Sequence, residues 1–343
     1  MFVGRDIGWS CVPYTAVQDW PTLRIPPLGV VPQRDRRPRL IVDYTYSGLN
    51  EETLPLAPRE AMQFGRALQH VCSNIVYAPP QYGPVSMSNI DITDGFYRVW
   101  VQIDDIPKLG VAIPTASGFP LVASPLALPM GWVESPPYFT AFTDTACDLA
   151  NSRLRADPRT DQRLTTRHRL EETVAAIPLS DHDTPHRPAT TRATEAVRLS
   201  PGKRRPVASA DVYVDDFLLL AQTQHERRRV MRAVLHSIDD VFWPLEKEDP
   251  PACKEPAYVK KMLNGDACWS TQKRMLGWDI DSEAVTLVLP PHRIQRLREV
   301  LAWIQPPRKR LAVAKWHQLL GELRSMSRPY RERAACFPSF SRR

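Results

Sequence analysis

Hydrophobic residues along the chain follow two different periods, one typical of strands and one typical of helices. Val212 and Val214 alternate with polar residues, and an apolar run covers residues 217–220. This pattern predicts the two strands of a hairpin. Asp215 and Asp216 stand where the hairpin should turn.

Helices are expected where apolar side chains recur every three or four residues. The segments with this pattern are residues 58–72, 135–151, 224–242, 291–304 and 314–326. Short strands are expected before Asp91 and near residues 99–103, followed by a hairpin through residue 120. The helix over residues 224–242 should pack its apolar face under the sheet that contains the hairpin.

Asp215 and Asp216 are the first candidates for chemistry. Two carboxylates about 4 Å apart repel each other by roughly 4 kcal/mol at an effective dielectric constant of about 20. The fold gains nothing from this pair unless a cation is shared, so the pair suggests a divalent metal site. The alternative is that Asp is simply a common turn residue.

A second acidic position follows a predicted strand far upstream. Asp91 ends an extended segment and precedes an Asp-Gly-Phe-Tyr sequence at residues 94–97. A hard cation such as Mg²⁺ takes oxygen ligands, and sites that catalyse in-line displacement at phosphorus hold two such ions. Asp91 with Asp215 and Asp216 would supply ligands from more than one strand.

These segments resemble two motifs of the reverse transcriptase family. Motif A of that family has an Asp followed five residues later by an aromatic residue, as Asp91 is followed by Phe96. Motif C reads Tyr-x-Asp-Asp, which residues 213–216 match in full, beginning at Tyr213.

A third match lies between these two, in the order that the family requires. Residues 128–151 resemble motif B, a Leu-Pro-x-Gly loop followed by Ser-Pro and a helix. Ser135 can cap this helix and Pro136 fits its first turn. One face of the helix is apolar and contains Phe139, Phe142, Ala146 and Leu149. An ordinary buried helix would explain that face but not the order of the motifs.

Two flanking segments are similar to the fingers strand and the primer grip of the family. Arg39 stands at the position of the Arg that contacts the nucleotide triphosphate, although Thr45 replaces a second Arg of the motif. Leu276, Gly277 and Trp278 match the primer-grip hairpin with its Leu-Gly core.

Further similarities concern motif D and the subfamily. Lys260 and Lys261 lie where the family places a motif D lysine, and a solvated surface role is the alternative. The Asp-Gly-Phe-Tyr-Arg sequence at residues 94–98 and the Lys-Trp-His segment at residues 315–317 are similar to retrotransposon polymerases of the long-terminal-repeat type.

The resemblance covers residues 26–327 and implies an α+β right-hand polymerase, with an antiparallel palm sheet backed by helices, plus fingers and a helical thumb. The implied domains are residues 1–85 (N-terminal extension and fingers), 86–150 (palm with motifs A and B and a fingers hairpin), 151–209 (insertion), 210–285 (palm with motifs C and D and primer grip) and 286–343 (helical thumb and basic tail).

The implied activity is that of an RNA-directed DNA polymerase, in which a primer 3′-hydroxyl attacks the α-phosphate of a deoxynucleoside triphosphate. Asp91, Asp215 and Asp216 would anchor two Mg²⁺ ions, with Mn²⁺ as an alternative metal and the backbone carbonyl of Ile92 as a further ligand. Implied partners are an RNA or DNA template with its primer, deoxynucleotides, and other parts of a retroelement polyprotein.

The resemblance also implies a nucleotide pocket. Its residues are Arg39, Phe96, Met130, Gly131, Tyr213 and Lys261. Phe96 matches the steric gate that excludes a ribose 2′-hydroxyl, which favours DNA synthesis. Met130 replaces the Gln common at its position, so a polar contact is not implied there.

Composition agrees with this reading. The formal net charge of +7 suits a polyanionic partner, and bases gather after residue 293, where a solvated helix face is the alternative. The six cysteines include no Cys-x-x-Cys pair, which argues against structural zinc and disulfides. With no apolar leader or unbroken apolar span, we expect an intracellular protein, cytoplasmic or nuclear, that is neither secreted nor bound to a membrane.

The segment over residues 152–209 is longer than a connection between motifs B and C needs. It is rich in Arg, Pro and Thr and has little apolar periodicity, so we expect it to be largely disordered with at most one short helix. It is either a nucleic-acid-binding arm or an expanded surface loop. His182 and His186 lack a third ligand and are not expected to bind zinc.

Two other functions remain open from the sequence. A retroelement remnant could keep the motifs and at most bind nucleic acid without copying it. An RNA-copying RNA polymerase could use the same palm, although Phe96 and the Tyr-x-Asp-Asp motif argue for DNA synthesis.

Overall fold

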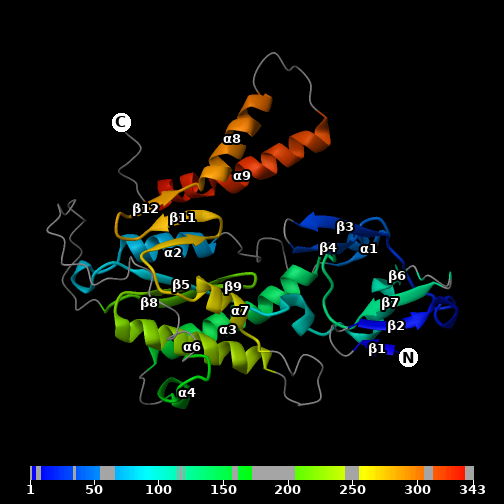
Figure 1. Cartoon of the computed structure of the whole chain (residues 1–343), viewed down its shortest axis with the longest axis horizontal. Coiled ribbons are helices and arrows are strands. Elements are labelled where there is room, and N and C mark those ends of the chain that lie inside the picture. Colours follow the sequence, from blue (N-terminus) through cyan, green and yellow to red (C-terminus); the bar gives the residue numbers. More distant parts are fainter. Residues whose placement is uncertain are drawn as a thin grey trace. The chain divides into compact units, whose positions relative to one another are not determined.

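The computed structural model describes residues 2–4, 9–33, 36–54, 66–113, 115, 118, 120–156, 161–171, 205–243, 255–304 and 312–336. The chain divides into two compact units (Figure 1). Unit 1 comprises Met1–Gln63, Asp91–Leu149 and His236–Val259, and unit 2 comprises Phe64–Ile90, Ala150–Leu235 and Lys260–Arg343. Both units combine helices with antiparallel strand pairs, which confirms the mixed helix and sheet architecture.

Unit 1 contains a four-stranded antiparallel sheet in the order β1-β2-β7-β6. Its strands are β1 (Phe2–Gly4), β2 (Trp9–Pro13), β6 (Val111–Ile113) and β7 (Leu121–Pro125). β7 lies between two partners and is buried along most of its length. The β6–β7 hairpin corresponds to the hairpin expected through residue 120.

The second sheet of unit 1 is a hairpin of β3 (Leu28–Gln33) and β4 (Arg36–Val42), followed by the short helix α1 (Leu49–Glu52). One buried core contains residues of β4, α1 and β6, and its members are Val42, Tyr44, Leu49, Leu109 and Val111. The Tyr44 hydroxyl donates to the backbone carbonyl of Leu109 at 3.2 Å, so its polar group is satisfied inside this core.

The strand expected near residues 99–103 is confirmed only at its start. Trp100 forms an isolated antiparallel bridge with Ala127, flanked by hydrogen bonds of 2.9 Å that involve Val99 and Val101. Ile103 is 78% exposed and begins a 3₁₀ helix. The alternating pattern predicted a strand, but Ile103 has no core to face. The 3₁₀ helices of unit 1 are η1 (Tyr14–Ala16), η4 (Gly95–Arg98) and η5 (Ile103–Leu109).

Unit 2 contains a three-stranded sheet in the order β5-β9-β8. Its strands are β5 (Ser86–Asp91), β8 (Ala208–Tyr213) and β9 (Asp216–Ala221). The central strand β9 is buried on both faces, because Phe217, Leu218, Leu219 and Leu220 all have an exposure of 0%. Successive side chains of a strand point to opposite faces, so both faces of this sheet must be covered.

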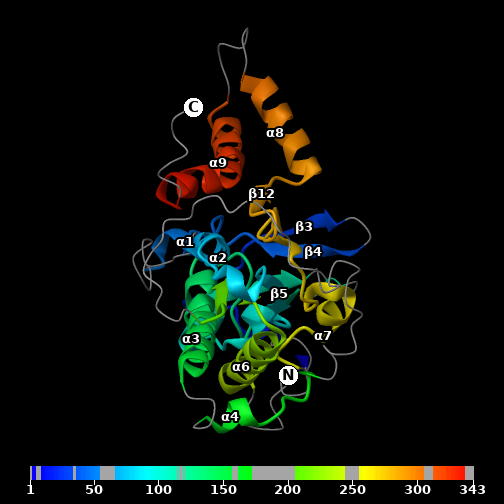
Figure 2. The same cartoon turned by 90° about the vertical axis from the view of Figure 1, so that its left-hand side faces the viewer.

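One face of this sheet is covered by α2 (Arg66–Val76). Leu68 and Val71 of α2 belong to the same buried cluster as Leu218 and Leu220 of β9. α2 also packs against a second antiparallel sheet, in the order β10-β11-β12, so it lies between the two sheets in Figures 1 and 2. The strands of that sheet are β10 (Gln272–Met275), β11 (Trp278–Asp281) and β12 (Thr286–Val288).

The end of α2 differs from the prediction of a helix over residues 58–72. Residues 58–65 lie outside the described part of the chain. The helix continues to Val76 because Ile75, with an exposure of 7%, extends the apolar face by one turn. The shorter helical segments of unit 2 are η3 (Pro80–Tyr82), α4 (Gln162–Thr165), α7 (Val259–Lys261) and the π-helical segment η8 (Met262–Asp266).

The long helices agree with the apolar periodicity. They are α3 (Ser135–Arg155), α6 (Gln224–Phe242), α8 (Pro291–Ile304) and α9 (Val313–Cys336). α6 and α8 have the predicted bounds, whereas α9 continues past residue 326. α6 runs beneath the β5-β9-β8 sheet (Figure 2), as the sequence predicts.

The segment after motif B contains more order than expected. Leu164, His168 and Leu170 are buried, and the Arg232 guanidinium on α6 binds both carboxylate oxygens of Glu171 at 2.6 and 2.8 Å. These contacts hold residues 161–171 against α6. Residues 172–204, with His182 and His186, lie outside the described residues.

Two further expectations concern cysteines and membranes. Free thiols are found at Cys11, Cys72, Cys147 and Cys268. Within the described ranges, no helix has the length and the apolar character that a membrane crossing requires.

Candidate functional site

The Tyr-Val-Asp-Asp segment forms the tight hairpin that the sequence predicts. Tyr213 of β8 pairs with Asp216 of β9, so Val214 and Asp215 are the two residues of the turn. Val214 has a φ of 59°, which is an outlier for a β-branched residue. A fold tolerates such strain only where the surrounding structure fixes the backbone, as the strands on both sides do here.

The two carboxylates of this hairpin differ in environment. Asp215 is exposed at the turn, whereas Asp216 is partly buried at the start of β9. Burial raises the pKa of Asp216 above its usual range, because the carboxylate loses hydration. A bound cation would compensate for that loss, so the chemistry of this pair fits a hard divalent metal.

Asp91 is the last residue of β5, and its exposure is only 4%. Its backbone carbonyl accepts a hydrogen bond from the amide of Tyr258 at 2.8 Å, and Ile92 forms an antiparallel bridge with Ala257. The amide of Thr93 donates to the backbone carbonyl of Pro256 at 2.8 Å. The backbone at residues 91–93 is thus held by residues 256–258.

Phe96 is fixed by an aromatic contact within unit 1. Its ring meets that of Phe139 on α3 edge to face, with the centroids 5.1 Å apart and the planes at 83°. The Phe139 ring also approaches Gly95, where an added Cβ would lie 3.4 Å from it. Phe139 in turn packs on Phe242. The predicted gate residue therefore packs in a defined position against α3.

Arg98 also holds this loop, and the sequence reasoning did not select it. Its guanidinium donates to the carbonyl of Thr93 at 2.6 Å and to that of Glu255 at 2.9 Å. Burial lowers the pKa of Arg98, while Asp94 and Glu255 favour the charged form. The signal in the sequence was its place at the end of the Asp-Gly-Phe-Tyr-Arg match at residues 94–98.

The loop at residues 129–135 depends on a glycine. Gly131 has a φ of +106°, and a Cβ there would come within 2.3 Å of the carbonyl oxygen of Val42. Only glycine fits such a close approach of two backbones. Met130, next to it, is 37% exposed. Ser135, expected as a cap of α3, instead donates its hydroxyl to the carbonyl of Pro129 at 2.6 Å.

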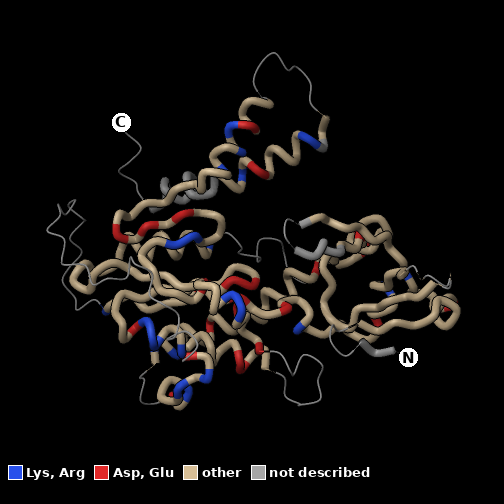
Figure 3. Tube along the Cα trace, in the orientation of Figure 1, with Lys and Arg blue, Asp and Glu red and all other residues tan. Residues whose placement is uncertain are grey.

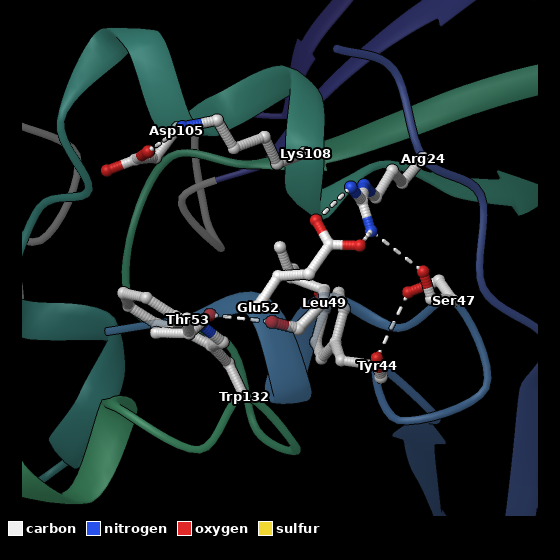
Figure 4. Close-up of polar contacts among 9 residues, drawn as sticks. All are labelled: Arg24, Tyr44, Ser47, Leu49, Glu52, Thr53, Asp105, Lys108 and Trp132. Atoms are coloured by element: carbon white, nitrogen blue, oxygen red, sulfur yellow. Dashed lines mark hydrogen bonds and ion pairs between the residues drawn. The ribbon is translucent and has the colours of Figure 1, made fainter. Parts of the chain in front are cut away.

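Asn50 ties this loop to the segment after β4. Its Nδ2 donates to the carbonyl of Gly131 at 3.1 Å, and its Oδ1 accepts from the amide of Val133 at 2.9 Å. The indole of Trp132 donates to the hydroxyl of Thr53 at 3.2 Å (Figure 4). The side-chain amide of Asn50 thus pairs with one carbonyl and one N–H of the loop, as a backbone peptide group would. The sequence alone did not reveal this role.

Beside this loop, unit 1 has a cavity of about 530 Å³. Its walls include Trp132 and two ion pairs, Arg24 with Glu52 and Lys108 with Asp105 (Figure 4). The Arg24 guanidinium also donates to the carbonyl of Ser47 at 2.9 Å, and its hydrogen bonds lower the pKa of Glu52.

The segment predicted to be the primer grip is the tight turn between β10 and β11. Leu276 and Gly277 both have positive φ, 51° and 77°, as a type I′ hairpin turn requires. Trp278 has an exposure of 4% and lies in the core of unit 2. Only the turn, not the indole, is therefore at the surface. Lys261 ends α7 and is partly buried.

The remaining predicted residues are distributed between the two units. The structure describes the backbone of Arg39 in β4 but not its side chain. Unit 1 contains Arg39, Asp91, Ile92, Phe96, Met130 and Gly131, and unit 2 contains Tyr213, Asp215, Asp216, Lys261, Leu276, Gly277 and Trp278.

The predicted metal ligands stay a prediction. β5, which ends at Asp91, is the neighbour of β9, which begins at Asp216. Over the described part of the chain, no group of three or more His, Cys, Asp or Glu residues is placed so that it could hold a metal ion.

The charges of α8 and α9 are mixed where side chains are described. Figure 3 shows acidic and basic residues interspersed along these helices. Arg296 on α8 binds Glu322 on α9 at 2.7 Å, and Lys315 lies 5.4 Å from the centre of the Trp303 ring. The bases at residues 308–310 and the side chains from residue 327 onward lie outside the described part, so the basic surface expected there stays a prediction.

Comparisons with known proteins gave similarity at the level of structure. No protein-family model matches the chain, and no curated protein matches it. Foamy viral protease-reverse transcriptase in complex with double-stranded DNA is similar, with 17% identity and a TM-score of 0.47 over 91% of this chain and 44% of that chain. The same protein with an RNA/DNA hybrid shows 18% identity and a TM-score of 0.43 over 88% of this chain and 27% of that chain. The chain thus spans less than half the length of these structures.

Proposed function

We propose that this chain is an RNA-directed DNA polymerase of a retroelement. The observation that carries the proposal is the hairpin at residues 213–216, in which a strained two-residue turn holds adjacent carboxylates at the end of a buried central strand. The neighbouring strand β5 ends in a third, buried carboxylate, Asp91. Motifs A, B and C follow one another along the chain in the order of the reverse transcriptase family that the sequence resembles. Residues 213–216 match the Tyr-x-Asp-Asp sequence of motif C in full.

In this proposal Asp91, Asp215 and Asp216 hold two Mg²⁺ ions, with the backbone carbonyl of Ile92 as a further ligand. Bound metal would activate the primer 3′-hydroxyl and neutralise charge on the phosphates. The strained turn contributes by fixing Asp215 and Asp216 before metal binds, which lowers the cost of ordering the ligands.

In this proposal the nucleotide pocket takes Arg39, Phe96, Met130 and Gly131 from unit 1, and Tyr213 and Lys261 from unit 2. Phe96, held by Phe139, would close the pocket against a ribose 2′-hydroxyl. Gly131 and Met130 would form the wall of the pocket, in a loop positioned by Asn50. Arg39 would bind the triphosphate, as a guanidinium suits phosphate oxygens.

Primer extension on an RNA template with Mg²⁺ tests this function. We expect extension with deoxynucleotides for the native chain and a loss of at least about a hundredfold for Asp215→Asn, because one metal ligand loses its charge. Glu299→Gln, which alters an exposed carboxylate on α8 paired with Arg296, is the matched control and should extend normally.

Three other results of the primer-extension experiment would contradict the proposal. Equal extension by the native chain and Asp215→Asn would refute the metal role. Template binding without extension by any variant would identify a retroelement remnant. Faster use of ribonucleotides than of deoxynucleotides would identify an RNA polymerase and contradict the role of Phe96 as a gate.

A further inference from the structure

Arg293 connects three elements of unit 2. It lies in the first turn of α8, and its Nη1 donates to the carbonyl of Gly277 in the β10–β11 turn at 2.8 Å. Its Nη2 donates to the hydroxyl of Ser325 on α9 at 2.7 Å. The guanidinium also lies 5.8 Å from the centre of the Trp278 ring. One side chain therefore contacts both helices and the turn.

Gly277 has two reasons to be glycine. Its φ of +77° suits the type I′ turn. In addition, a Cβ at this position would lie 2.7 Å from Nη1 of Arg293, so a side chain there would displace the guanidinium from its carbonyl. The turn is thus shaped to receive Arg293 as well as to reverse the chain.

The strength of this contact follows from its chemistry. A charged donor makes a stronger hydrogen bond to a carbonyl than a neutral donor does. The planar guanidinium can also serve two acceptors on different elements at once, which an ammonium group on a lysine cannot do with the same geometry. The aromatic ring of Trp278, buried in the core of unit 2, adds a favourable face for the cation.

Within the described part of the chain, a second arginine on α8, Arg296, contacts α9 but not the β10–β11 turn, so it serves as a comparison for Arg293. Arg296 binds Glu322 on α9 and Glu299 on α8. These ion pairs lie at the surface, where such pairs contribute little to stability, and their partners lie on α8 and α9. Arg293 differs because its contacts include the turn at Leu276 and Gly277.

We propose that Arg293 is a positioning residue that transmits the position of α8 and α9 to the turn at residues 276–277, and thereby sets how firmly the primer terminus is held. This inference rests on the proposed polymerase function, in which that turn contacts the primer. It predicts a defect in primer holding and not in nucleotide binding.

The experiment compares Arg293→Ala, Arg293→Lys and the matched control Arg296→Ala. For Arg293→Ala we expect the dissociation constant of primer–template to rise about tenfold, the effect of losing a charge-assisted hydrogen bond. The KM for deoxynucleotides should stay within about twofold, since the nucleotide pocket is not touched. Arg293→Lys should recover only part of the loss, and Arg296→Ala should bind primer–template as the native chain does.

Amide hydrogen exchange of the protein without nucleic acid tests the coupling between Arg293 and the turn at residues 276–277. This test does not depend on the proposed polymerase activity. Faster exchange over residues 275–278 in Arg293→Ala, with no such change in Arg296→Ala, supports the coupling even if no variant extends a primer. In that case the polymerase proposal fails and the positional link stands. Unchanged exchange at the turn would overturn the inference, as would equal effects of the two alanine variants on primer holding.

Gly277→Ala provides a second route to the same contact. If it acts by displacing Arg293, the double variant Gly277→Ala with Arg293→Ala should bind primer–template more tightly than the product of the two single effects predicts. Multiplicative effects would show that the turn and the arginine act independently and would contradict the proposal.

Discussion

At the scale of single residues, the site depends on backbone contacts that only particular side chains permit. Gly131 lets the loop before α3 approach the carbonyl of Val42, and Asn50 bonds to the carbonyl of Gly131 and to the amide of Val133. The loop is therefore fixed by its contact with a distant strand end. A change at Gly131 should therefore disturb the folding of this loop.

Gly131→Ala should lower the free energy of unfolding by roughly 2 to 4 kcal/mol, because a positive φ is combined with a backbone clash. Gly265 is a matched control, since it has the same φ of +106° but no atom within 4 Å of an added Cβ. Gly265→Ala should therefore cost less by about 2 kcal/mol. Equal losses in chemical denaturation would show that the contact with Val42 contributes nothing.

Single residues also show where sequence reasoning reached its limit. Tyr213, Asp215 and Asp216 were predictable, because the hairpin is encoded by neighbouring residues. The burial of Trp278 was not, since it depends on α2, more than two hundred residues earlier. The contacts of Asn50 were not predictable for a similar reason: its partners are 81 and 83 residues away.

At the scale of elements, local patterns predicted helices better than isolated strands. The periodicity over residues 224–242 gave α6 its observed bounds, because a helix depends on contacts within one segment. Residues 99–103 had the alternation of a strand, yet a strand needs a partner and a core on one side. Ile103 has neither and begins η5 instead.

The contact of β8 with α2 predicts a pH dependence of stability. Asp211 of β8 accepts from His70 of α2 at 2.7 Å, and burial raises the pKa of Asp211 to about 6, with the histidine opposing that shift. Because this pKa lies above the ordinary aspartate value of 3.8, the folded state binds the proton more tightly than the unfolded chain does. Stability is therefore lost as the pH rises from about 4 to about 6.

Asp211→Asn removes this ionisation while keeping a polar side chain. The variant should gain stability over the native chain by about 2 kcal/mol between pH 4 and pH 6, with a constant difference at higher pH. Thermal or urea unfolding of both proteins across this range measures the difference. A difference that does not vary with pH would contradict the assignment to Asp211.

At the scale of the whole molecule, the proposed reaction needs residues of both units. Unit 1 contains Asp91 and the loop at residues 129–135, and unit 2 contains the hairpin at residues 213–216 and the turn at residues 276–277. The polymerase proposal requires that Asp91 share metal ions with Asp215 and Asp216.

Binding of Mn²⁺, followed by electron paramagnetic resonance in the presence of primer–template and a non-hydrolysable deoxynucleotide, tests that requirement directly. We expect the native chain to bind two ions, and Asp91→Asn and Asp215→Asn each to weaken binding by at least about tenfold. Glu299→Gln should bind as the native chain does. Native-like binding by both aspartate variants would contradict the central claim that these carboxylates, from separate segments, hold the same metal ions.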